Sequence, residues 1–163
     1  MTPPTAASGD PDAATIEPAD FAARPEAQAQ LRILYDGGCP FCLREVRVLR
    51  QRDQRLHPDD PRLAFVDIND PGYDPSAHAG VGYRAAMGRI HAITADGEVL
   101  RDVAVFRRAY ALVGLGWLYA PTSWPCLRQL ADAVYGLWAR WRLRLTGRPS
   151  LEQLCSDRCR PLP

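Results

Sequence analysis

The amino-acid sequence predicts an α/β fold: a mixed four-stranded sheet flanked by helices, with a helical extension at the C-terminus. Three observations lead to this prediction. Two short apolar runs, at 31–35 and 63–68, enclose a segment whose apolar residues recur at helical spacing. Two further runs flank the turn signal Asp96-Gly97, which is typical of a β-hairpin. From residue 103 onward the apolar residues again follow a helical period.

The first half of the predicted domain is a strand–helix–strand unit. Residues 31–35 are expected to form a buried strand, and the turn Asp36-Gly37-Gly38 follows it. Pro40 suits the first position of a helix, where its missing N–H needs no partner, so we expect a helix over about 40–53. The strand at 63–68 should run parallel to the first, because a crossover helix connects them.

The second half should supply an antiparallel hairpin and then helices. Segment 70–82 is rich in Gly, Pro and Asp and is expected to be a connection. The remaining elements expected are a short helix at 83–87, strands at 89–94 and from 99, helices at 103–113 and 127–145, and a last short helix after Ser150. This order, β-α-β and then β-β-α, is that of the thioredoxin fold.

The chain is expected to hold one domain preceded by a tail. It has 163 residues, of which 47% are hydrophobic and 24% charged, so it can bury a core without disulfide or metal staples. Residues 1–29 are rich in Ala and Pro and carry few large apolar side chains, so we expect a disordered N-terminal tail. Residues 30–163 then form the thioredoxin-like domain with its C-terminal helices.

Composition also bears on location and partners. The N-terminus has neither the basic start nor the apolar centre of a secretory signal, and no stretch of bilayer-spanning length is free of Pro, Gly and charge. We therefore expect a cytoplasmic protein without a transmembrane segment. In the reducing cytosol a close cysteine pair is more often catalytic or metal-binding than a permanent disulfide. The formal net charge of +1 argues against nucleic acid as a partner.

The motif Cys39-Pro40-Phe41-Cys42 lies between the first predicted strand and helix. Free N–H groups and the dipole at a helix N-terminus stabilise a thiolate, so the pKa of Cys39 should be lowered. Because the thiolate is the nucleophile in thiol–disulfide exchange, Cys39 is expected to attack and Cys42 to resolve the mixed disulfide. This chemistry needs no cofactor. It needs a disulfide substrate and an external thiol reductant, and the sequence identifies neither.

Other roles for the cysteines stay open. A Cys-x-x-Cys pair also forms half of a zinc site, and Cys155 and Cys159 could supply the other half. We assign no metal, because zinc-binding pairs usually lie on turns rather than at the head of a β-α unit. Cys155 and Cys159 could instead form a second thiol pair that passes electrons to the first, since their spacing puts them on one helix face.

Segment 138–148, rich in Trp and Arg, could make the chain a non-catalytic module that binds a partner or a membrane surface. The simpler interpretation is an amphipathic helix whose Trp side packs on the sheet while its Arg side lies in solvent. Peripheral membrane contact stays open at this point.

The run YDGGCPFC at residues 35–42 resembles the signature of the thiol–disulfide oxidoreductase DCC family, which takes its name from an Asp and two Cys. The resemblance covers about residues 31–155. It implies a thioredoxin-like fold and a redox-active dithiol.

Three residues are candidates for supporting roles. Asp36 could act as a proton acceptor, but we expect it instead to anchor the loop before Cys39 by accepting backbone N–H groups. Pro40 sets the rigidity of the motif. Thioredoxins carry a cis-proline that faces the dithiol before the third strand, and the alignment puts Arg89 near that place. Arg89 could attract an anionic partner such as glutathione.

Overall fold

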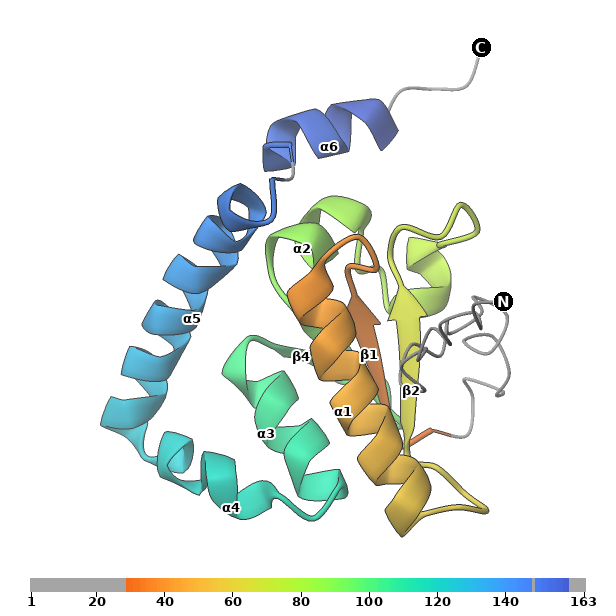
Figure 1. The fold of residues 1–163 in the computed structure, drawn as a ribbon, viewed down its shortest axis with the longest axis vertical. Helices are drawn as coiled ribbons and strands as arrows, with labels where there is room; N and C mark the ends of the chain where they lie inside the picture. The colour runs from red at the N-terminus through yellow and green to blue at the C-terminus, as the bar shows by residue number, and fades with distance from the viewer. Residues whose placement is uncertain (1–28, 148, 159–163) are drawn as a thin grey trace, which may run out of the picture.

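The computed structural model describes residues 29–147 and 149–158, so all of the expected tail except residue 29 lies outside the described residues. The described strands form one four-stranded sheet in the order β2-β1-β3-β4. Strand β1 runs parallel to β2 and antiparallel to β3, and β3 runs antiparallel to β4. The strand bounds are β1 Leu31–Tyr35, β2 Leu63–Asp67, β3 His91–Thr94 and β4 Val99–Arg101. The mixed sheet of the predicted fold is confirmed (Figure 1).

The helices also follow the predicted order. Helix α1 continues beyond its expected end, and two short helical segments (α4 and η4) precede the long helix α5. The bounds are α1 Pro40–Leu56, η3 Pro75–His78, α2 Tyr83–Gly88, α3 Val103–Leu112, α4 Gly116–Tyr119, η4 Ala120–Ser123, α5 Pro125–Leu145 and α6 Leu151–Arg158. In the described part of the chain, no helix is long and apolar enough to cross a membrane.

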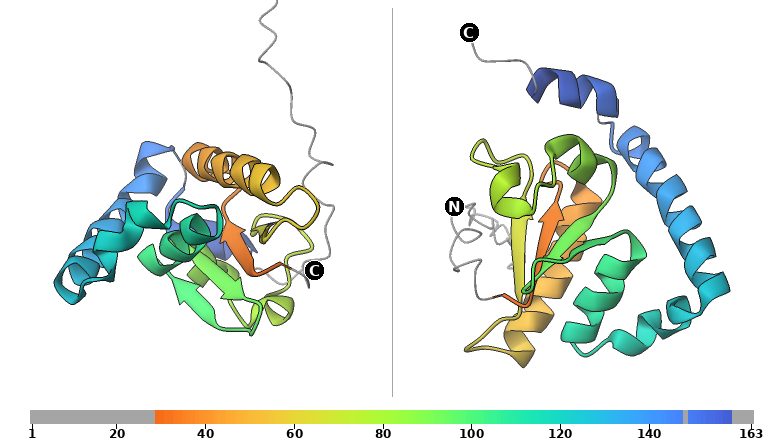
Figure 2. Two further views of the ribbon diagram at one scale, coloured as in Figure 1. Left: turned by 90° about the horizontal axis from the view of Figure 1, so that it is seen from below. Right: turned by 180° about the vertical axis from the view of Figure 1, so that it is seen from behind.

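Helices cover both faces of the sheet. Because side chains alternate along a strand, neighbouring residues of β1 enter different cores. Ile33 packs with Leu49 of α1 and Val105 of α3, whereas Leu34 packs with Met87 of α2. Helix α6 lies against this second core (Figure 2). The dithiol motif at the head of α1 therefore starts from a firmly packed central strand.

The far end of α1 is tied to the start of β2. Asp53 is buried, and its carboxylate accepts the N–H of Leu63 at 2.8 Å and contacts Nδ1 of His57 at 2.9 Å. Helix α1 ends at Leu56, and the N–H of the next residue, His57, makes the last helical hydrogen bond, to the Asp53 carbonyl. These contacts hold α1 in place over the sheet.

Helix α5 is turned in the opposite sense to the expectation. Trp141 is 58% exposed, whereas Arg142 is only 4% exposed. The prediction that the Trp side packs on the sheet is wrong, and the prediction that the arginines are solvated holds for Arg140 and Arg144 but not for Arg142. Helix α5 has this orientation because α1 and α3 already cover that face of the sheet. Helix α5 instead lies along the outside of the molecule and contacts α3 (Figure 1).

Candidate redox site

The loop between β1 and α1 is held by two carboxylates. Oδ1 of Asp36 accepts the N–H of Gly38 at 3.0 Å and Nδ2 of Asn69 at 2.7 Å. Oδ1 of Asp67 accepts the N–H of Gly37 at 2.9 Å. A Cβ at Gly37 would collide with the Asp67 carboxylate, so the close approach requires glycine. This loop places the next residue at the start of α1.

Cys39 is the N-cap residue of α1, and Pro40 follows it in the first helical turn. The N–H of Cys39 donates to the Asp36 carbonyl at 3.0 Å, which closes the turn. Cys39 is only 1% exposed, whereas Cys42 is half-buried. Neither of the two sulfurs is in a disulfide.

The surroundings of the two sulfurs shift the pKa values of Cys39 and Cys42 in opposite directions. The pKa of Cys39 is lowered to about 6, chiefly because the Cys42 thiol donates a hydrogen bond to it. The N–H groups of Cys42 and Phe41 and the charge of Arg142 act in the same direction, and burial opposes them. The pKa of Cys42 is raised by that same hydrogen bond and by burial. Near neutral pH the pair therefore holds a thiolate on Cys39 and a thiol on Cys42.

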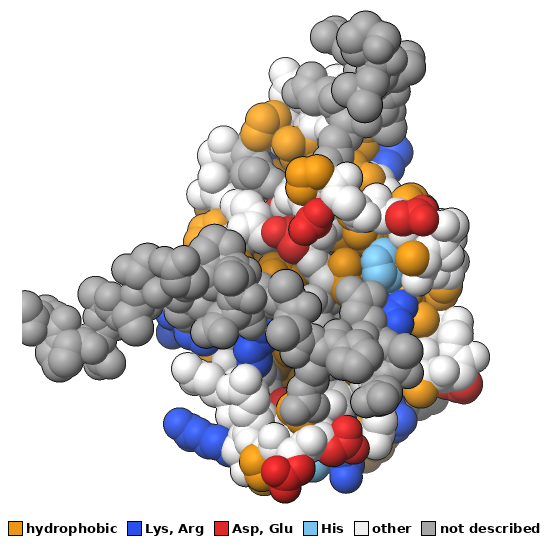
Figure 3. Space-filling view, turned by 90° about the vertical axis from the view of Figure 1, so that its right-hand side faces the viewer, with side chains coloured by type: hydrophobic (Ala, Val, Ile, Leu, Met, Phe, Trp, Pro, Cys, Tyr) orange, Lys and Arg blue, Asp and Glu red, His pale blue; other side chains and the backbone are white. Residues whose placement is uncertain are grey.

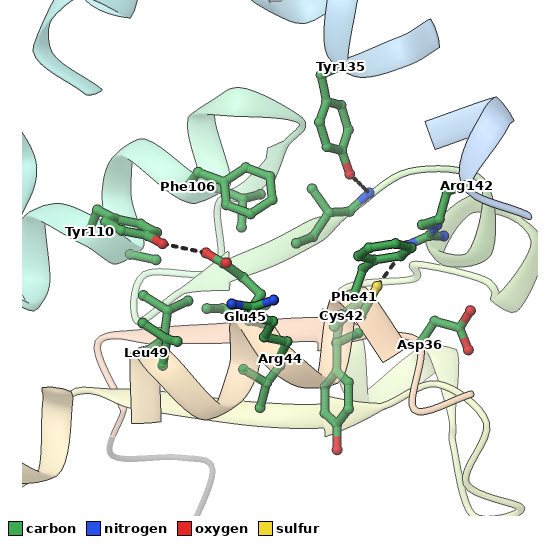
Figure 4. Close-up of a pocket in the computed structure, with 18 of the residues that line it drawn as sticks. Asp36, Phe41, Cys42, Arg44, Glu45, Leu49, Phe106, Tyr110, Tyr135 and Arg142 are labelled. Carbon is green, nitrogen blue, oxygen red and sulfur yellow. Dashed lines mark hydrogen bonds between the residues drawn. The ribbon is translucent and has the colours of Figure 1, made fainter. Parts of the chain in front are cut away.

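Arg142 reaches this pair from α5. Its Nη1 donates to Sγ of Cys42 at 2.9 Å (Figure 4). Its Nη2 donates to the Met87 carbonyl at 2.9 Å. Burial favours the neutral form of Arg142, but Cys42 and Cys39 outweigh it and raise the pKa of the guanidinium. The site thus includes a buried cation in contact with a thiol.

Sequence reasoning missed Arg142, because it grouped this residue with the solvated arginines of the helix. One signal could have separated it from them. Ala131, Tyr135, Trp138 and Arg142 follow one another at spacings of three or four, so they share one side of the helix. Arg142 therefore continues a side that is otherwise apolar, unlike Arg140 and Arg144.

A cavity of about 330 Å³ extends from Cys42 between α1, α3 and α5. Its wall is mostly apolar and aromatic (Figure 4). The hydroxyl of Tyr110 donates to Oε1 of Glu45 at 2.7 Å, and the hydroxyl of Tyr135 accepts the N–H of Ile90 at 3.2 Å. The wall includes Phe41 and Cys42 of the motif and Tyr135, Trp138 and Arg142 of α5. A ligand in this cavity would meet Cys42.

The contacts of Arg89 are with residues other than the thiols. Its Nη1 donates to Oδ2 of Asp102 at 2.6 Å, and half of the side chain is exposed. It is not among the residues that line the cavity. The cation that the structure brings to the thiols is Arg142, and a supporting role for Arg89 stays a prediction.

The second cysteine pair cannot be placed as a pair. Cys155 is a buried free thiol in α6, and Cys159 lies outside the described residues. Among the residues that the structure describes, no three His, Cys, Asp or Glu side chains gather as metal ligands would. Electron transfer through Cys155 and Cys159 stays a prediction.

The sequence profile of the DCC1-like thiol-disulfide oxidoreductase family matches residues 33–148. The chain belongs to this family. The match confirms the resemblance seen in the YDGGCPFC run and supports a redox function on a thioredoxin-like fold. No solved structure matches the chain.

A relative from Arabidopsis thaliana, "Uncharacterized protein At5g50100, chloroplastic", is 44% identical over 129 residues. The aligned part covers 79% of this chain and 58% of the relative, so the chain spans little more than half the length of that protein. The expectation of a cytoplasmic location is wrong in the light of this finding, since the name of the relative assigns it to the chloroplast.

Proposed function

We propose that this chain is a thiol–disulfide oxidoreductase that exchanges the Cys39–Cys42 dithiol with the disulfide of a substrate. The observation that carries the proposal is the position of Cys39 at the N-terminus of α1, where a hydrogen bond from the Cys42 thiol lowers its pKa. A thiolate at neutral pH attacks disulfides, whereas a thiol does not. The proposed mechanism starts from the reduced pair.

The exchange takes place in two displacements. Sγ of Cys39 attacks one substrate sulfur, the substrate S–S bond breaks, and the leaving thiolate takes up a proton. Cys42 then loses its proton and attacks Sγ of Cys39, which releases the second substrate sulfur as a thiol. Two electrons pass from the protein dithiol to the substrate disulfide. Arg142 stabilises the Cys42 thiolate as it forms, because Nη1 already contacts this sulfur.

The burial of Cys39 sets a condition on the first step. Because Cys39 is only 1% exposed, its sulfur cannot reach a disulfide outside the protein without local movement. Cys42 is less buried and opens to the cavity. The lowered pKa favours attack by Cys39, whereas access favours Cys42, so the order of attack needs its own test.

A redox titration tests the proposal. The protein is equilibrated in glutathione buffers of graded potential, and its free thiols are counted by mass. We expect one two-thiol transition that Cys39→Ser abolishes and Cys155→Ser preserves. If the Cys39–Cys42 pair stays reduced throughout, disulfide exchange fails as the function. If Cys155→Ser removes the transition, the second thiol pair takes part.

Trapping experiments decide which sulfur attacks. With an aromatic disulfide as substrate, Cys42→Ser should accumulate a mixed disulfide on Cys39, because the resolving thiol is absent. Cys39→Ser should react more slowly, since burial still raises the pKa of Cys42 when the Cys39 sulfur is absent. A stable adduct that forms faster on Cys42 than on Cys39 would reverse the assignment.

A further inference from the structure

Helix α5 exposes a continuous apolar stripe on its outer side. Leu130 and Leu137 are 60% and 61% exposed, and the other members are exposed as well. Spacings of mostly three or four residues keep these side chains on one face of the helix. This outer stripe consists of Leu127, Leu130, Val134, Leu137, Trp141 and Leu145. An apolar helix face usually packs against its own domain. No described residue covers this face of α5.

Exposed tryptophans occur in the outer stripe and in the segment that leads into α5. Trp141 belongs to it, and Trp138 lies at its border and is 40% exposed. Trp117 and Trp124, before the start of α5, are 71% and 70% exposed. Trp rings prefer the headgroup level of a bilayer, where the ring is buried and the indole N–H stays wet.

The charges beside the outer stripe have one sign. At 3.6 residues per turn, Arg140 and Arg144 lie along one border of the stripe, and both are exposed. Asp132 is the single acidic residue in the sequence of α5, and it lies on another side of the helix and is half-buried. The opposite side of the molecule differs, because acidic and basic side chains are mixed there (Figure 3).

From these observations we propose that the outer stripe docks on an anionic lipid surface, with α5 lying in the plane of the interface. A Leu and Trp face bordered by Arg is the chemistry that such helices use. Anionic headgroups would supply the opposite charge for Arg140 and Arg144. A second copy of this chain would not supply that charge, since the border of its own stripe has the same arginines and no acidic residue.

The docking does not depend on the proposed redox reaction, but the two are connected in space. Trp138 lines the cavity that leads to Cys42, and its ring lies 6.2 Å from that of Phe41 in an edge contact. A docked α5 would therefore hold the cavity beside the bilayer surface.

Vesicle binding tests the proposal. The full chain is mixed with vesicles of phosphatidylcholine, with or without phosphatidylserine, and binding is measured by co-sedimentation and by quenching of Trp fluorescence with brominated lipid. We expect binding to the anionic vesicles that weakens with salt. Leu130→Asp/Leu137→Asp should reduce the partition coefficient by more than about tenfold, because it puts charge in the apolar contact.

A charge variant gives a second readout that leaves the apolar face intact. Arg140→Ser/Arg144→Ser should lose about tenfold or more on anionic vesicles, with little change on neutral ones. The matched controls are Leu56→Asp for the apolar variant, and Arg47→Ser/Arg55→Ser, whose two arginines are exposed on α1, for the charge variant. Both controls should bind like the wild type.

Other outcomes overturn the proposal. If the wild type binds neither kind of vesicle, lipid docking is wrong. If the wild type is a dimer in solution and Leu130→Asp/Leu137→Asp makes it a monomer, the outer stripe belongs to a second copy instead. The redox titration of the same variants should match the wild type, so a failure of docking is distinguishable from a failure of the oxidoreductase function.

Discussion

Replacing Arg142 by Met removes a buried cation from the dithiol while keeping a long apolar stem. The structure shows what is lost: one hydrogen bond to Sγ of Cys42 and one to the Met87 carbonyl, both at 2.9 Å. The first contact acts on the sulfur that must become a thiolate in the resolving step. We therefore expect Arg142→Met to slow the attack of Cys42 on the mixed disulfide more than the first attack by Cys39.

The size of the effect follows from the geometry. A hydrogen bond to a charged group contributes about 1.5–3 kcal/mol, which is about one to two pK units for the Cys42 thiolate. Each unit removes about nine-tenths of the thiolate but returns about threefold in intrinsic nucleophilicity. The resolving step should therefore slow about three- to tenfold. The charge of Arg142 is one of the smaller causes that lower the pKa of Cys39, so this pKa should rise by less.

The assay follows the lifetime of the mixed disulfide by acid quenching and mass analysis. Arg142→Lys keeps the charge but loses the two-pronged geometry, so it should restore part of the rate. Arg144→Met is the matched control, since this neighbour is exposed. The pH profile of Cys39 alkylation separates electrostatics from a change in packing. If Arg142→Met resolves the mixed disulfide as fast as Arg144→Met and leaves that profile unchanged, Arg142 does not act on the thiols.

Three other perturbations test the site. Alkylation of the reduced protein by iodoacetamide should show a midpoint near pH 6 for Cys39. Cys42→Ala should move this midpoint to higher pH, because the hydrogen bond that Cys42 donates to Cys39 is lost. An unchanged midpoint would show that this hydrogen bond does not lower the pKa of Cys39. The folded pKa of Cys39 lies below the unfolded value of about 8.5, so the thiolate stabilises the folded protein fully above the unfolded pKa and progressively less as the pH falls. The free energy of unfolding in urea should thus fall by up to about 3 kcal/mol between pH 8.5 and pH 6, and Cys39→Ser should flatten this slope. Gly37→Ala should cost about 1–3 kcal/mol, because the new methyl group displaces Asp67 from its hydrogen bond. Gly82→Ala, where a Cβ meets nothing within 4 Å, is its control, and equal thermal stability of the two variants would refute the argument.

Local sequence was sufficient for the backbone frame of the site. Pro40 predicted the start of α1, and the two glycines before Cys39 predicted the tight turn that the structure contains. Short apolar runs and the turn signal Asp96-Gly97 predicted the strands in the right order. These features depend on residues close in sequence, where conformational preferences and hydrogen bonds within a few positions decide the backbone.

The partners of the loop carboxylates were less accessible. The sequence predicted that Asp36 anchors the loop, and the structure shows its contact with Gly38. The sequence did not indicate that Asp67 and Asn69, about thirty positions later, complete the anchor. They meet the loop because β1 and β2 are parallel neighbours, so their carboxyl ends lie together.

The orientation of α5 was beyond the sequence because an amphipathic pattern does not say which side is covered. The pattern has two candidate inner sides, one with Leu137 and Trp141 and one with Tyr135 and Arg142. Burial of the first would normally win, since it removes more apolar surface from water. The domain leaves no sheet face for it, because α1 and α3 occupy that face.

The family, the fold and the place of Cys39 at a helix N-terminus could thus be predicted from residues close in sequence. The contact between Arg142 and the sulfur of Cys42, one hundred positions earlier, and the aromatic cavity beside it became visible in the folded chain. The same holds for the exposed apolar side of α5. A contact between distant residues depends on which surfaces the rest of the fold has already covered, and short runs of sequence do not contain that information.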